Sequence, residues 1–83
     1  MLRRSSVLHL VIEYTDKGCL EEILRIFRAN NIKVLNMQIT RHTRDAQHNA
    51  CGIFELRLNK KCGKENLFEL LENTTGIISI DKL

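Results

Sequence analysis

With 83 residues, 43% of them hydrophobic and 28% charged, the chain is long enough for one small core and too apolar to remain disordered. Only 5% of the residues are aromatic and none is tryptophan, so the core has to be aliphatic. The formal net charge of +3 comes from scattered residues, which argues against nucleic-acid binding, and no apolar run approaches the roughly 20 residues of a membrane helix.

The first predicted elements are a strand and an amphipathic helix. Residues 6–15 alternate, and their more apolar face carries Leu8, Leu10, Ile12 and Tyr14. From Leu20 the apolar side chains recur at helical spacing until Asn30–Asn31, where asparagine tolerates the left-handed conformation common at helix ends. Asp16 lies directly before this helix, where a carboxylate caps free N–H groups.

Two further strands with a loop between them follow the helix. Residues 32–41 alternate again, but the apolar parity changes at Val34–Leu35, which predicts a β-bulge or a strand with both faces partly covered. His42–Asn49 has no apolar period and predicts a long hairpin loop. Ala50–Leu58 alternates once more, which predicts the partner strand of that hairpin.

The chain ends with a turn at Asn59–Gly63, a short helix at residues 65–73 and a last strand at Ile77–Ile80. The order β-α-β-β-α-β predicts an α+β, ferredoxin-like fold in a single domain, with a four-stranded antiparallel sheet and two helices on one face. The other face stays open and is expected to carry Val7, Val11 and Ile53. Exposed apolar side chains there predict a homodimer, formed through a sheet edge or through the open face.

The chain lacks the residues that two functions common to this topology require. An RNA-recognition module stacks bases on aromatic side chains of its central strands, and these strands offer only Phe54. No Ser–His–acid or Cys–His pair has a convincing context, and Cys19, next to the apolar Leu20, is expected to be a buried thiol rather than a nucleophile. We therefore expect neither an RNA-binding protein nor an enzyme. Three cysteines without a C-x-x-C pair predict free thiols in a reducing cytoplasm.

The stretch from residue 42 to residue 51 concentrates side chains with metal-ligand chemistry, namely His42, Asp45, His48 and Cys51. Their spacing matches no common zinc template. We therefore favour a solvated loop without a metal or another cofactor. A metal-binding module that uses His42 and His48 is the alternative.

Two segments resemble a known family. The segment from Asp16, D-K-G-C-L-E-E-I-L-R-I-F-R-A-N-N-I-K-V-L-N-M, resembles the signature of ACT domains at Gly18, Leu20, Asn31 and Ile32. The segment T-T-G-I-I-S-I-D resembles the closing G-V-x-x-V strand of the same family at Gly76, Ile77 and Ile80. In the commonest family form an acid stands at the place of Thr15, whereas here Asp16 lies one residue nearer to the glycine.

The resemblance implies a non-catalytic regulatory or oligomerisation domain. In amino-acid-sensing members, the turn before the helix and a strand of the next subunit hold the ligand. The candidate ligand-binding residues are accordingly Thr15, Asp16, Lys17, Gly18, Asn31 and Ile32. Gly18 is expected to adopt backbone angles that a side chain would forbid and so to expose the N–H groups of the helix start to a small anion, and Lys17 would pair with a carboxylate. Because the acid is shifted, we favour a capped helix start without any ligand over amino-acid sensing.

The resemblance allows several parent proteins, because such domains are usually parts of larger chains. Of these we favour the cytoplasmic tail of an MgtC-type membrane protein linked to magnesium homeostasis, where Leu2-Arg3-Arg4 would suit the inner side of a last membrane helix. This domain would then be cytoplasmic, tethered by a preceding segment and not itself inserted. The alternative is a biosynthetic or stringent-response enzyme with an amino-acid-sensing domain.

The two loop histidines provide a direct test of the solvated loop. Replacing His42 or His48 with alanine should change the free energy of unfolding by no more than about 0.5 kcal/mol, because the loop has no apolar anchor. Thermal melts with and without zinc check this. A large zinc-dependent rise in melting temperature that His48→Ala abolishes would establish the metal site instead.

Overall fold

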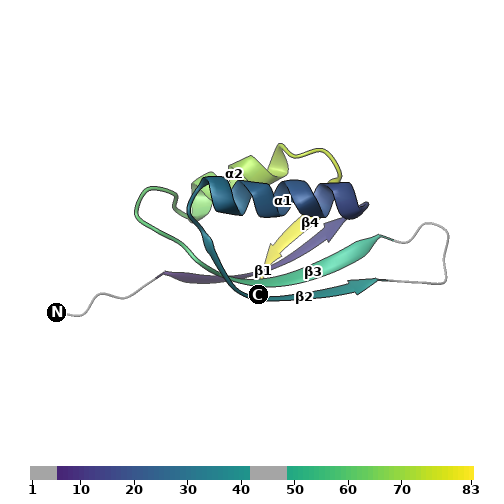
Figure 1. The fold of residues 1–83 in the computed structure, drawn as a ribbon, viewed down its shortest axis with the longest axis horizontal. Helices are drawn as coiled ribbons and strands as arrows, with labels where there is room; N and C mark the ends of the chain where they lie inside the picture. The colour runs from purple at the N-terminus through teal and green to yellow at the C-terminus, as the bar shows by residue number, and fades with distance from the viewer. Residues whose placement is uncertain (1–5, 42–48) are drawn as a thin grey trace.

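The computed structural model describes residues 6–41 and 49–83. Its elements are, in chain order, β1 (Val7–Tyr14), α1 (Lys17–Ala29), β2 (Lys33–Arg41), β3 (Ala50–Arg57), α2 (Lys64–Glu72) and β4 (Ile77–Lys82). The strands form one sheet in the order β2-β3-β1-β4, with antiparallel pairing throughout. Both helices lie on the same side of this sheet (Figure 1). The predicted ferredoxin-like α+β architecture is therefore confirmed.

The core lies between the helices and the sheet face that they cover. The predicted inner face of β1 is buried, since Leu10 and Ile12 are fully inaccessible and Leu8 and Tyr14 nearly so. In the neighbouring strand, Phe54 lies opposite Leu10 and its ring meets the ring of Phe27 edge-on, with centroids 5.6 Å apart. The aliphatic core predicted from the composition is thus built around one aromatic pair.

A bulge in β2 explains the parity change of its sequence. The pairing of β2 with β3 shifts between Val34 and Asn36, so that Leu35 is the extra residue. Because directly paired residues share a face, Val34 and Met37 both lie on the helix side, opposite Leu56 and Phe54. The predicted bulge is confirmed, and it keeps the apolar residues of β2 on one face.

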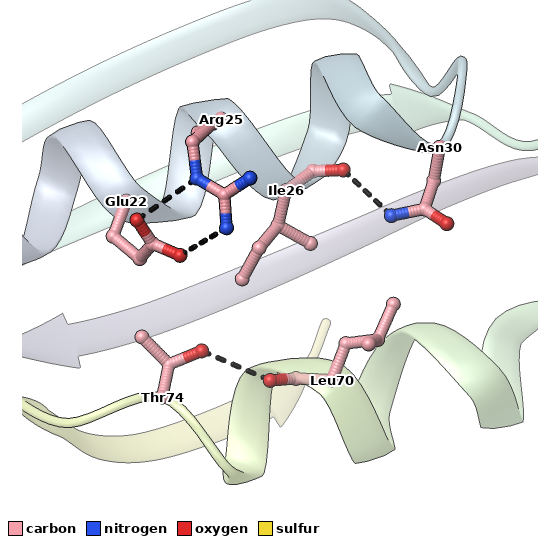
Figure 2. A network of polar contacts seen from close by, with 6 residues as sticks. All are labelled: Glu22, Arg25, Ile26, Asn30, Leu70 and Thr74. Carbon is pink, nitrogen blue, oxygen red and sulfur yellow. Dashed lines mark hydrogen bonds and ion pairs between the residues drawn. The ribbon is translucent and has the colours of Figure 1, made fainter.

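The end of α1 is fixed by a left-handed residue, as predicted. Asn31 has a φ of 57°, and the amide of Ile32 donates to the carbonyl of Phe27 at 2.8 Å. The amide of Asn31 donates to the carbonyl of Arg28, which completes a Schellman motif. The side chain of Asn30 also donates to the Ile26 carbonyl (Figure 2). Asparagine therefore stops this helix through both backbone conformation and side-chain bonding.

Polar side chains also secure the surface of α1 and the end of α2. Arg25 forms two hydrogen bonds to the carboxylate of Glu22, one turn earlier in α1 (Figure 2). Thr74 donates its hydroxyl to the carbonyl of Leu70 at the end of α2. The Glu22–Arg25 pair is exposed and contributes little to stability.

Two predictions concern residues at or beyond the limits of the description. The predicted loop His42–Asn49 and the metal candidates His42, Asp45 and His48 lie outside the described residues, apart from Asn49 itself. Within residues 6–41 and 49–83 no group of His, Cys, Asp and Glu side chains could hold a metal ion. No helix of the described part is long and apolar enough to cross a membrane.

Gly76 occupies a position that only glycine fits. Its φ of 99° lies in a region that L side chains rarely adopt, and its carbonyl accepts the amide hydrogen of Thr15 at 2.9 Å. A Cβ at this position would lie 2.9 Å from the Thr15 hydroxyl and 3.0 Å from the sulfur of Cys19. The residue that precedes β4 therefore packs closely against the turn between β1 and α1.

We expect Gly76→Ala to lower the free energy of unfolding by about 1 to 3 kcal/mol, because it adds backbone strain and a steric clash. Gly18→Ala is the matched control, since a Cβ there would meet only the Asp16 carboxylate oxygen, at 3.5 Å. The control should be neutral or stabilising by up to about 1 kcal/mol. Urea unfolding compares the two variants, and equal stabilities would contradict the role given to Gly76.

Candidate functional site

A hollow of about 410 Å³ opens beside the turn that joins β1 to α1. Its volume falls in the range of small-molecule pockets, roughly 300 to 1,000 Å³. Three of its walls are the end of β1, the first turn of α1 and the neighbouring ends of β2 and β3. The lining residues are Tyr14, Thr15, Asp16, Lys17, Leu20, Ile39, Asn49 and Ala50.

Asp16 holds the first turn of α1 in place. Its backbone is extended, and its Oδ1 accepts the amide hydrogen of Cys19 at 2.9 Å. The predicted N-cap is therefore confirmed. Such a cap satisfies one of the amides that open a helix, while the amides of Lys17 and Gly18 have no acceptor within the helix. They lie at the positive end of the helix dipole, next to the exposed Lys17 side chain.

Cys19, in the first turn of α1, packs beneath the surface of this site. Its side chain is buried against Gly76. Burial raises the pKa of the thiol, and the nearby Asp16 carboxylate raises it further. The thiol is therefore neutral at physiological pH and unsuited to nucleophilic attack. The prediction that Cys19 is a buried thiol is confirmed.

The β3 side of the hollow is held by a polar contact across the sheet. Asn49 donates from its side-chain amide to the Glu13 carboxylate at 3.4 Å, and the Ser79 hydroxyl donates to the same carboxylate at 3.5 Å. Asn49 thus connects the hollow to the last residues of β1. The antiparallel register explains this wall, because it places Ala50 opposite Tyr14 and so brings the start of β3 to the turn.

The structure separates the predicted site residues into two groups. Thr15, Asp16 and Lys17 line the hollow, and Gly18 follows them as an exposed residue of α1. Asn31 and Ile32 lie past the opposite end of this 13-residue helix, about 20 Å away. Within one copy they form the helix end described above and do not line the hollow.

The expectation that Gly18 supplies an unusual backbone conformation is wrong. Gly18 is an ordinary helical residue, without a positive φ, and the space at its Cα is open. The turn obtains its special backbone from Gly76 instead, which lies about sixty positions later in the chain and reaches the turn only through tertiary packing.

Sequence reasoning did not identify Ile39, Asn49 and Ala50 as walls of the hollow. The only available signal was the predicted hairpin of β2 and β3, which implies that the end of one strand and the start of the next lie together. Ile39 does pair with Gly52, one of the first residues of β3. Antiparallel pairing of β1 with β3 then places this hairpin beside Tyr14.

A raised thiol pKa makes the stability of the protein sensitive to alkaline pH. In the unfolded chain Cys19 ionises near the ordinary pKa of a cysteine thiol, about 8.5. The folded thiol stays protonated to higher pH, because its pKa is raised. Its stabilising contribution is present below the unfolded pKa and is lost as pH rises toward the folded pKa. Wild type should therefore lose more stability between pH 7 and about pH 10 than Cys19→Ala. If urea unfolding shows that wild type and Cys19→Ala lose equal stability over this pH range, the expectation is contradicted.

Comparisons with known proteins support the architecture. No protein-family model matches the chain, and no curated protein is similar to it. Among solved structures, the chain is similar to the ACT domain from the GTP pyrophosphokinase of Chlorobium tepidum. The two share 15% sequence identity with a TM-score of 0.69, over 96% of this chain and 100% of that one. The chain therefore has the ferredoxin-like fold of an ACT domain.

Proposed function

We propose that the chain is a non-catalytic regulatory domain that binds a small polar molecule in the hollow beside the β1–α1 turn. The observation that carries this proposal is the meeting of Asp16, Lys17 and the open first turn of α1 at one cavity. The fold likeness to an ACT domain supports a regulatory role. The neutral, buried Cys19 thiol is unsuited to act as a nucleophile.

The chemistry of the hollow suits a small molecule that carries one negative and one positive group. The amides of Lys17 and Gly18 and the ammonium group of Lys17 favour a carboxylate or another small anion. Asp16 uses Oδ1 for the cap, so its Oδ2 is the atom that would meet a ligand ammonium group. Leu20 and Ile39 supply apolar surface between these groups. An amino acid has this combination of groups.

A second copy of the chain would complete the hollow. β2 is an edge strand of nine residues, and Val34, Leu35 and Met37 on it are 36%, 37% and 41% exposed. A long apolar edge with unpaired backbone groups favours pairing with another strand. Ile39 of the same strand lines the hollow, so a second copy paired along β2 would lie against its open side.

We further propose that the domain regulates a larger enzyme located in the cytoplasm. The similar solved structure is a domain of a GTP pyrophosphokinase, which favours a stringent-response or biosynthetic enzyme as the parent. The comparisons lend no support to the tail of an MgtC-type membrane protein. All three cysteines are free thiols, which fits a reducing compartment.

Isothermal titration with the twenty amino acids and common nucleotides tests the ligand. We expect one of the amino acids to bind, and Lys17→Ala to weaken its binding about tenfold, equivalent to about 1.4 kcal/mol. Asp16→Ala should weaken binding and also lower stability by about 1 kcal/mol, because it removes the cap. Lys64→Ala is the matched control, since Lys64 is the first residue of α2 as Lys17 is of α1.

The titration separates a binding site from a structural turn. If no compound binds to wild type, and Asp16→Ala changes only the stability, the turn is a capped helix start and the domain serves assembly alone. If Lys64→Ala weakens binding as much as Lys17→Ala, the ligand is not held in this hollow.

A further inference from the structure

A second hollow, of about 460 Å³, lies at the end of the sheet where β1 and α2 both begin. Figure 1 shows these two starts at the same end of the molecule. This cavity, here called the α2 hollow, is lined among others by Ser6, Gly63, Lys64 and Lys82, and none of the described residues that line it is acidic. No described residue lines both hollows, so the chemistry of the α2 hollow is independent of the proposed function.

Two lysines give the α2 hollow a positive charge. Lys64 is the first residue of α2, and Lys82 lies on β4 directly opposite Leu10 of β1. Because directly paired residues share a face, Lys82 lies on the helix side of the sheet, where Leu10 is buried. Both lysines are exposed, and neither forms an ion pair with another described residue. The α2 hollow therefore favours an anion.

The start of α2 lacks a side-chain cap. Gly63 occupies the N-cap position with an extended backbone, whereas Asp16 fills the same position at α1. The amides of Lys64 and Glu65 have no acceptor within the helix and lie at the positive end of its dipole. A Cβ at Gly63 would meet nothing within 4 Å beyond its chain neighbours, so there is room beside these amides. Glu65, the acidic residue of this turn, lines a neighbouring hollow and not this one.

Ser6 extends β1 by one residue at the edge of the α2 hollow. Its carbonyl accepts the amide hydrogen of Leu58 at 2.8 Å, which continues the pairing of β1 with β3. Side chains alternate along a strand, so Ser6 lies on the same face as the buried Leu8. Ser6 itself is exposed. Its hydroxyl is therefore accessible, on the side of the sheet that carries Lys64 and Lys82.

The sequence around Ser6 is that of a kinase substrate. Arg3 and Arg4 stand three and two positions before Ser6, and Val7 follows it. Serine kinases with acidic side chains in their substrate groove select arginines at these two positions, because a guanidinium group pairs bidentately with a carboxylate. Ser5 has its two arginines one position closer. Ser6 is therefore the better substrate of the two serines.

We propose that Ser6 is a phosphorylation site and that its phosphate is held in the α2 hollow. The Ser6 hydroxyl oxygen attacks the γ-phosphorus of ATP on an arginine-selective serine kinase. The bond from this phosphorus to the ADP oxygen breaks, the hydroxyl proton passes to the base of the kinase, and ADP leaves. The phosphate then accepts hydrogen bonds from the ammonium groups of Lys64 and Lys82 and from the first amides of α2.

A phosphate in this place would supply the acceptor that α2 lacks and would fasten the start of β1 to the start of α2. Charge-assisted hydrogen bonds of this kind stabilise the folded state. Nearby ammonium groups also favour the dianion, so they should lower the second pKa of the phosphate below the value of about 6 for exposed phosphoserine. A phosphate that remains in solvent would show neither effect.

The modification is tested by incubating the chain with ATP and a purified serine kinase that selects arginines at these two positions. Mass spectrometry should locate one phosphate on Ser6. Ser5→Ala should retain this phosphate, and Ser6→Ala should lose it. If no phosphate is incorporated, or if it is located on Ser5, the proposal is overturned.

Thermal melts and ³¹P titrations of the chain with phosphoserine at position 6 test the seat of the phosphate. We expect a melting temperature at least about 4 °C above that of the unmodified chain, and a lowered phosphate pKa. Lys64→Ala and Lys82→Ala should each reduce both shifts, when each phosphorylated variant is compared with its own unmodified form. Lys33→Ala is the matched control, because this exposed lysine pairs with Arg57 at the same end of the sheet but does not line the α2 hollow.

Inorganic phosphate separates a modification from a site for free anions. At about 1 mM it should raise the melting temperature of the unmodified chain less than the attached phosphate does, since attachment gives a higher effective concentration. An equal rise would identify a free-anion site and overturn the proposal. The proposal also fails if the attached phosphate leaves the melting temperature unchanged, keeps a pKa of about 6, or responds as strongly to Lys33→Ala as to Lys64→Ala.

Discussion

The close approach of Gly76 to the β1–α1 turn is the constraint on which the candidate site depends. One backbone hydrogen bond to Thr15 and one contact with Cys19 join the start of β4 to the turn. The segment that leads into β4 therefore holds the turn on one side, and the Asp16 cap holds it through a hydrogen bond inside the turn. Neither contact covers the side of the turn that borders the hollow, where the first amides of α1 and the Lys17 side chain lie.

The fold was largely predictable from local patterns, since period, capping and turn residues all agree in this chain. Alternation predicted the buried face of β1, and the parity change at Val34–Leu35 predicted the bulge that the register confirms. Asp16 and Asn31 predicted the two ends of α1, because both act on backbone groups within a few residues of themselves.

The site was only partly predictable, because its walls come from distant parts of the chain. Thr15, Asp16 and Lys17 were identified through the family resemblance, but Ile39 and Asn49 reach the hollow only by strand pairing. Asn31 and Ile32 belong to the same sequence signature, yet α1 keeps them a full helix length from the turn. A signature collects residues that matter to a fold, and it does not tell which of them border one cavity.

The pairing of β4 with β1 has a consequence for the order in which the structure forms and opens. β4 is a six-residue edge strand whose partners lie about seventy positions earlier in the chain, so closing this contact carries a high entropic cost. Its release would remove the support beneath Thr15 while leaving the β2–β3 hairpin and its pairing with β1 in place. Any binding in the hollow would thus depend on an edge strand outside it, and a bound molecule would slow amide hydrogen exchange in β4 without touching it.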